Sequence, residues 1–263
     1  MAFEYPSSDG VLIPGKRGNL FGHYYLPGGP YPRPVVLIAH GIPGNERLFD
    51  FSIYLREHGF CTVNFHYSGC WGSEGDYSIP HCFEDIGSAV EYIRRNENGW
   101  FDLDNFFFVG HSMGGLMGAY AISSYEAIRA GVLLAPFNLR IAAEPVLKGE
   151  HGSFWDELFS TEAGDTWLKN FSREDFVRYV SEDPDRYDLL SYAEGLSKKN
   201  VFVVTCSRDI VCPKDVHGGA LAEAIAKAGG VVQHTTYDSD HSFNTRRGEI
   251  RQDVTKFLLD QVK

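Results

Sequence analysis

Residues 106–121 of the chain read FFFVGHSMGGLMGAYA. The first four are aromatic or β-branched, which is typical of a strand buried on both faces of a parallel sheet. The residues after Gly115 are small or favour a helix. Between these two parts, Gly110 and Gly114 stand two positions before and after Ser112. The stretch therefore predicts a serine on a tight turn between a buried strand and a helix.

Such a turn has a mechanical reason for its glycines. Its serine has a strained backbone conformation, and only glycine-sized neighbours let the strand and the helix approach closely. The hydroxyl then projects above the sheet at the amino end of the helix, where free N–H groups and the helix dipole favour a developing negative charge. The Gly-x-Ser-x-Gly pattern alone would also fit an ordinary glycine-rich turn. The apolar strand before it and the helix after it favour a nucleophilic Ser112.

Further apolar runs alternate with helical patterns along the chain. An antiparallel ribbon is expected around residues 20–26. Strands are expected at 35–39, 60–65, 131–135, 201–205 and 231–237, and helices at 48–58, 83–94, 213–228 and 246–259. Strands that alternate with helices predict an α/β protein with a mainly parallel, doubly wound sheet flanked by helices.

The alternation stops between residues 137 and 194. This segment has no strand-like run, but it has short helical patches and ten aromatic residues. Ser172 and Asp175 form a capping box before one of these patches. We expect the segment to be a helical insertion over the carboxyl edge of the sheet, where sites of such sheets form.

The glycine-flanked serine and its surroundings resemble the α/β-hydrolases, and the resemblance covers nearly the whole chain. It implies a hydrolase core built from residues 1–136 and 195–263. Residues 137–194 would then be a cap, or lid, inserted after the sixth strand. It also implies a catalytic set in the chain order serine, acid, histidine.

A serine hydroxyl needs an adjacent base, and His241 is the best candidate among ten histidines. It lies in a polar loop, residues 238–243, between the last strand and the last helix, where the resemblance places the catalytic histidine. The alternative is an ordinary surface histidine. His111 is expected to pack under the serine turn, and His40 to position the backbone of another turn.

The acid that orients His241 is predicted to be Asp209, just after the strand at 201–205. The order Ser112, Asp209, His241 is that of the α/β-hydrolases. Asp238 is the rival acid. Asp209 could instead form an ion pair with Arg208 or cap the next helix.

Two backbone N–H groups are needed to bind the oxyanion of a tetrahedral intermediate. Met113 follows the candidate nucleophile and should supply one. The resemblance places the other in the His-Gly-x turn, residues 40–44, where Ile42 is the donor because Pro43 has no N–H. A plain Gly-Pro turn is the alternative.

The composition limits the kinds of partner that we expect for the protein. A formal net charge of −11 argues against nucleic acid or an anionic membrane as partner. The chain has no secretory pattern and no apolar run of membrane-spanning length, so a cytoplasmic location is expected. Its five cysteines show no paired ligand spacing, and no His-Glu-x-x-His motif occurs. We therefore expect neither a metal nor a cofactor.

The leading functional hypothesis is a carboxylic ester hydrolase that acts through an acyl-serine intermediate on a small-molecule ester. The aromatic-rich insertion favours an apolar or aromatic acyl group, and its size and position resemble the feruloyl and cinnamoyl esterases. Serine aminopeptidase-like hydrolases, thioesterases and carbon–carbon bond hydrolases use the same skeleton. A non-catalytic binding protein that kept the fold is the alternative from another class.

Overall fold

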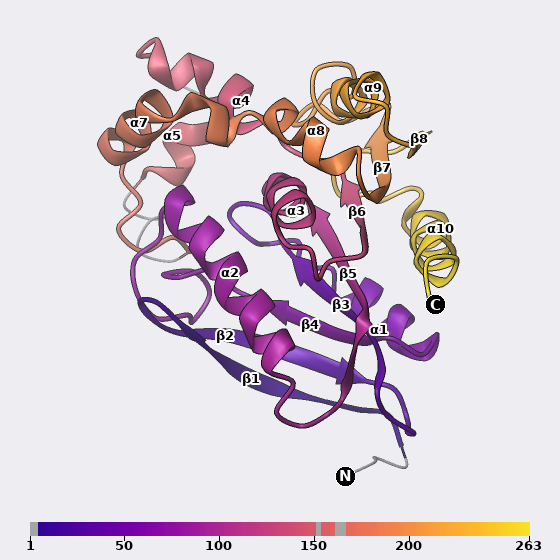
Figure 1. Cartoon of the computed structure of the whole chain (residues 1–263). Helices are drawn as coiled ribbons and strands as arrows, with labels where there is room; N and C mark the ends of the chain where they lie inside the picture. The colour runs from indigo at the N-terminus through magenta and orange to yellow at the C-terminus, as the bar shows by residue number, and fades with distance from the viewer. Residues whose placement is uncertain (1–4, 151–153, 161–166) are drawn as a thin grey trace.

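A computed structural model describes residues 5–150, 154–160 and 167–263 of the chain. An eight-stranded sheet with the order β1-β2-β4-β3-β5-β6-β7-β8 runs through the molecule (Figure 1). The strands are β1 (Ser7–Gly15), β2 (Gly18–Leu26), β3 (Arg33–Ala39), β4 (Cys61–Phe65), β5 (Phe101–His111), β6 (Ala130–Leu134), β7 (Asn200–Cys206) and β8 (Val232–Tyr237).

Only β2 runs in the opposite direction to the other strands. β1 pairs with β2, and β2 pairs with β4, in antiparallel register, and the other five pairs are parallel. The antiparallel entry ribbon and the mainly parallel sheet predicted from the sequence are therefore confirmed. Because parallel strands end at the same edge, the loops after β3, β5, β7 and β8 lie close together.

Helices cover both faces of the sheet (Figure 1). Alternate residues of β3 show why: Val35 and Leu37 belong to one buried core, and Val36 and Ile38 belong to the other. The first face carries α2 (Ile79–Arg95), α3 (Met113–Ser124) and α9 (Gly218–Lys227), and the second carries α1 (Phe49–Glu57) and α10 (Arg247–Leu259).

The predicted start of one helix is wrong. The sequence pattern predicts a helix from Pro213, but α9 begins only at Gly218. The preceding residue, His217, has φ −114° and ψ −100°, which no helix allows. Its ring Nδ1 accepts a hydrogen bond from the amide of Asn138 at 2.8 Å. This long-range contact accompanies a turn at residues 213–217, which the local sequence does not reveal.

The chain between β6 and β7 contains no strand among its described residues, and residues 151–153 and 161–166 of the predicted insertion lie outside the description. The helical elements are α4 (Leu139–Leu147), α5 (Phe154–Leu158), α7 (Arg173–Glu182), η1 (Pro184–Tyr187), η2 (Leu189–Tyr192) and α8 (Ala193–Leu196). The Ser172 hydroxyl accepts from the amide of Asp175 at the start of α7, as predicted.

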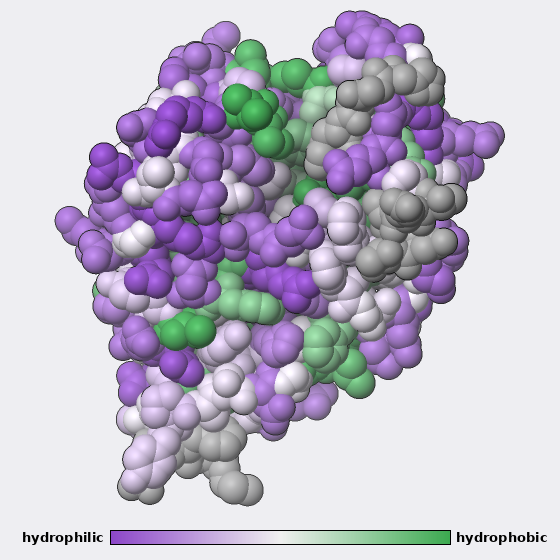
Figure 2. All heavy atoms as spheres, turned by 180° about the vertical axis from the view of Figure 1, so that it is seen from behind, coloured by the Kyte–Doolittle hydropathy of each residue, from purple (hydrophilic) through white to green (hydrophobic). Residues whose placement is uncertain are grey.

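This segment packs against the loop that follows β4. Trp167 stacks on Trp71 with ring centroids 6.4 Å apart, and Leu168 pairs with Cys70 in a single β-bridge. The rear surface of the molecule is mostly hydrophilic, with apolar side chains in small separate patches (Figure 2). None of the helices in the described part of the chain has the length and apolar character that a membrane span requires.

Candidate active site

Ser112 lies on the turn between β5 and α3, as the sequence predicts. Its φ of 56° and ψ of −120° place a non-glycine residue in a strained region. The amide donates to the oxygen of Leu134 at 2.9 Å, and the carbonyl accepts from Gly115 and Phe137. The side chain does not cap the helix. The backbone thus holds the strained turn, and the side chain of Ser112 interacts with the thiol of Cys212.

The flanking glycines are required by close approach. A Cβ atom at Gly110 would lie 2.0 Å from the oxygen of Gly114, and a Cβ at Gly114 would lie 2.2 Å from the oxygen of Ala39. A Cβ at Gly41, in the facing turn, would lie 2.7 Å from the Cβ of Ser112. These contacts explain why glycine occupies the positions around the serine.

Asp209 and His241 meet at the carboxyl edge of the sheet. Asp209 Oδ2 lies 2.7 Å from His241 Nδ1, and Oδ1 accepts from the amides of Val211 and Cys212. The side chain of Asp209 is fully buried, and that of His241 is 18% exposed. Burial raises the pKa of Asp209, but its hydrogen bonds to His241 and to the two amides prevail and lower it overall. A carboxylate that stays ionised orients the imidazole.

The rival acids have other partners. Asp238 forms an ion pair with Arg208 at 2.8 Å on the surface, and Asp240 accepts from Asn244. Arg208 thus pairs with Asp238 and not with Asp209. Of these three acids, Asp209 is the one whose carboxylate contacts the ring of His241.

A cavity of about 210 Å³ joins the separate segments. Its lining includes Ile42, Ser112, Phe137, Val211 and His241. No direct hydrogen bond links the Ser112 hydroxyl to the imidazole among the described residues, and such bonds often tighten only with substrate present. A larger cavity of about 630 Å³ lies between β1 and α2, and it shares no lining residue with the first.

The two predicted N–H donors lie on opposite turns of this region. The turn and loop hydrogen bonds of the described residues use neither the Ile42 nor the Met113 amide. Ile42 lines the cavity. The Met113 side chain is buried, and its sulfur accepts from the hydroxyl of Tyr77. The role of the two amides as oxyanion donors stays a prediction.

Sequence reasoning missed what His111 and Cys212 contact. His111 Nε2 donates to the main-chain oxygen of His241 at 2.9 Å. Cys212 is buried, and its sulfur lies within 4.8 Å of donor atoms of Asp209 and His241. Burial raises the pKa of its thiol. No spacing rule could reveal the contacts with His241, because His241 follows a different strand from His111 and Cys212.

A strained serine between a strand and a helix, on a mainly parallel sheet of this order, defines the class of α/β-hydrolase folds. The chain belongs to the alpha/beta hydrolase family, whose sequence pattern matches residues 35–252. This membership supports a hydrolase activity.

Comparison with known proteins agrees with the family. A proline iminopeptidase of Flavobacterium johnsoniae is 26% identical over 183 residues, covering 65% of this chain and 57% of that protein. Est1E of Butyrivibrio proteoclasticus, solved with ferulic acid bound, superimposes with a TM-score of 0.73 at 21% identity, over 95% of this chain and 98% of Est1E.

The acylaminoacyl peptidase of Pyrococcus horikoshii has a TM-score of 0.71 at 18% identity. The match covers 99% of this chain but only 42% of that protein. The chain thus spans about half the length of both peptidases that it resembles. At these identities, the solved structures show a shared fold alone.

Proposed function

We propose that the protein is a serine hydrolase that cleaves carboxylic esters through an acyl-serine intermediate. The observation that carries the proposal is the contact between the buried carboxylate of Asp209 and the ring of His241, which lines one cavity together with Ser112. Binding alone requires none of these three groups, which argues against a non-catalytic binding protein.

The chemistry divides into two half-reactions. His241 removes the proton of Ser112 while Oγ attacks the ester carbonyl, and the amides of Ile42 and Met113 stabilise the oxyanion. His241 then gives the proton to the leaving alcohol. In the second half it activates water, which releases the acid. Asp209 holds the tautomer of His241 and stabilises its cation.

We propose that the substrate carries an apolar or aromatic acyl group. Ile42, Phe137 and Val211 give the cavity apolar walls, and its volume of about 210 Å³ suits a compact group. The likeness to Est1E, which was solved with ferulic acid, agrees with an aromatic acid. We assign residues 1–136 and 195–263 to the hydrolase core, and residues 137–194 to a cap that bounds the substrate.

Cleavage of a peptide or aminoacyl bond is the second candidate. It is favoured by the likeness to a proline iminopeptidase and to an acylaminoacyl peptidase. Thioesters and carbon–carbon bonds are cleaved on the same skeleton. A panel of aryl esters, thioesters and aminoacyl amides separates these reactions by the ratio of kcat/KM values.

A fluorophosphonate probe tests the nucleophile. We expect the probe to label the wild type, and Ser112→Ala to lose both labelling and ester turnover while it keeps its circular dichroism. Ser123→Ala, on the same helix, is the control, because its hydroxyl donates to the oxygen of Tyr120 and Ser123 does not line the cavity. Full activity of Ser112→Ala would refute the mechanism, and a folded wild type that resists the probe would favour a binding protein.

A further inference from the structure

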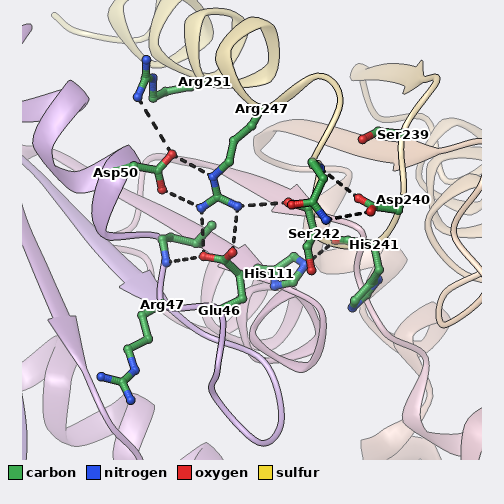
Figure 3. Close-up of polar contacts among 12 residues, drawn as sticks. Glu46, Arg47, Asp50, His111, Ser239, Asp240, His241, Ser242, Arg247 and Arg251 are labelled. Atoms are coloured by element: carbon green, nitrogen blue, oxygen red, sulfur yellow. Dashed lines mark hydrogen bonds and ion pairs between the residues drawn. The ribbon is translucent and has the colours of Figure 1, made fainter.

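Arg247 begins helix α10, and its side chain joins three segments of the chain (Figure 3). A guanidinium has five N–H groups, and each of those in Arg247 makes a hydrogen bond. Nη1 and Nη2 donate to Glu46 at 2.8 and 2.9 Å, and Nε and Nη2 donate to Asp50 at 2.8 and 2.5 Å. The remaining N–H, on Nη1, donates to the main-chain oxygen of Ser242 at 3.1 Å.

The three acceptors lie in segments whose relative positions matter for the proposed reaction. Glu46 follows the turn that carries Ile42, and it lines the candidate cavity. Asp50 lies in the first turn of α1. Ser242 directly follows His241, and it also lines the cavity. One side chain therefore ties the histidine loop to the turn of the oxyanion donor.

The geometry of this tie is rigid. The planar guanidinium binds both carboxylates through paired N–H groups, which fixes distance and direction together. The side chains of Arg247 and Glu46 are 24% and 26% exposed, so water competes only partly. Burial raises the pKa of Asp50, but the hydrogen bonds and charge of Arg247 outweigh it and lower the pKa overall. The ion pair is thus fully charged near neutral pH.

We infer that Arg247 is a positioning residue that sets the distance between His241 and the oxyanion donor of Ile42. It touches neither substrate nor reacting atoms. The inference rests on the proposed function, because it assigns Arg247 a role through His241. His111 also contacts this loop, at the carbonyl of His241.

The chain offers a matched control. Arg251, one turn further along α10, also faces Asp50 at 3.9 Å, but it contacts neither Glu46 nor Ser242 among the described residues (Figure 3). Arg247→Met and Arg251→Met remove the same charge from the same helix. Only the first releases the histidine loop.

We expect Arg247→Met to lower kcat and the rate of fluorophosphonate labelling by on the order of 10²-fold, since a shift of about 1 Å in a catalytic group has this effect. KM should change little. Arg247→Lys should recover part of kcat, because an ammonium can still reach one carboxylate. Arg251→Met should stay within about twofold of the wild type. Urea unfolding of each variant confirms that all are folded under the assay conditions.

Two results would overturn the inference: an unchanged kcat in folded Arg247→Met, or equal losses in Arg247→Met and Arg251→Met. If Arg247→Met does not fold, Glu46→Gln replaces it. This variant keeps the contacts to Asp50 and Ser242, and it should lower kcat while its unfolding midpoint stays at that of the wild type. Wild type that resists the probe would instead refute the proposed function, so the two failures are distinguishable.

Discussion

The Nε2 atom of His111 lies 2.9 Å from the main-chain oxygen of His241, although the two residues are 130 positions apart in the chain. A carbonyl only accepts, so Nε2 carries the proton. Burial lowers the pKa of His111 to about 3, which keeps the ring neutral near neutral pH. His111 directly precedes Ser112, and this bond therefore joins the serine turn to the histidine loop.

Replacing His111 by Leu should both destabilise the protein and slow the reaction. The oxygen of His241 would lose its buried partner, which costs about 1–3 kcal/mol in the free energy of unfolding. His111→Gln offers an amide donor and should lose less. Urea unfolding and ester kinetics measure the two effects. A Leu variant as stable and as active as the wild type would contradict the role of this bond.

Asp209→Asn should lower kcat by on the order of 10⁴-fold without unfolding the protein, because an amide favours the wrong tautomer of His241. The control is Asp238→Asn, which removes only an exposed ion pair with Arg208 and should leave kcat within about twofold. Steady-state kinetics on an aryl ester decide between the two acids. A greater loss in Asp238→Asn would identify the rival as the orienting acid.

Zinc ions should inhibit the proposed ester hydrolysis. Asp209, Cys212 and His241 offer a carboxylate, a thiol and an imidazole within 4.8 Å of one another, a donor set that suits Zn²⁺ and not Mg²⁺. A metal on His241 removes the base. Cys212→Ala should raise the half-inhibitory zinc concentration by at least about tenfold.

Cys61→Ala is the control for this prediction. Cys61 is the first residue of β4, so it lies at the amino ends of the parallel strands, whereas the candidate site lies at their carboxyl ends. It should remain as sensitive to zinc as the wild type, and a chelator should restore activity. Equal inhibition of Cys212→Ala and the wild type would place the zinc effect elsewhere.

The stability of the protein should fall as the pH decreases from about 6.5. Burial lowers the pKa values of four histidines, to about 4 in His40, 2 in His66, 3 in His111 and 4 in His217. Below the ordinary value of 6.5, the unfolded chain binds protons that the folded chain does not. Each histidine then lowers the free energy of unfolding by up to about 1.4 kcal/mol per pH unit, until its folded pKa is reached.

Urea unfolding at several pH values between about 7.5 and 5 measures this slope. A free energy of unfolding that stays constant over this range would show that the four rings are protonated as easily in the folded protein as in the unfolded chain.

The local sequence determined the architecture and the position of the serine. Buried strands such as Val35–Ala39 are apolar throughout, and a serine between Gly110 and Gly114 fits only a tight turn. These features depend on neighbours in the chain, because side-chain periodicity and glycine conformations are local properties. The mainly parallel sheet could be predicted for the same reason, whereas the order of its strands depends on long-range pairing.

The tertiary structure alone decided the partners. Asp209 and Asp238 both follow strand ends, and the chain order of the resembling family favoured Asp209. The structure shows the contacts: Arg208 binds Asp238, and Asp209 binds His241. The contacts of His111 and Arg247 join segments more than a hundred residues apart. Hydrogen bonds depend on distance and direction in space, and the loops set these only when the sheet has brought the strand ends together.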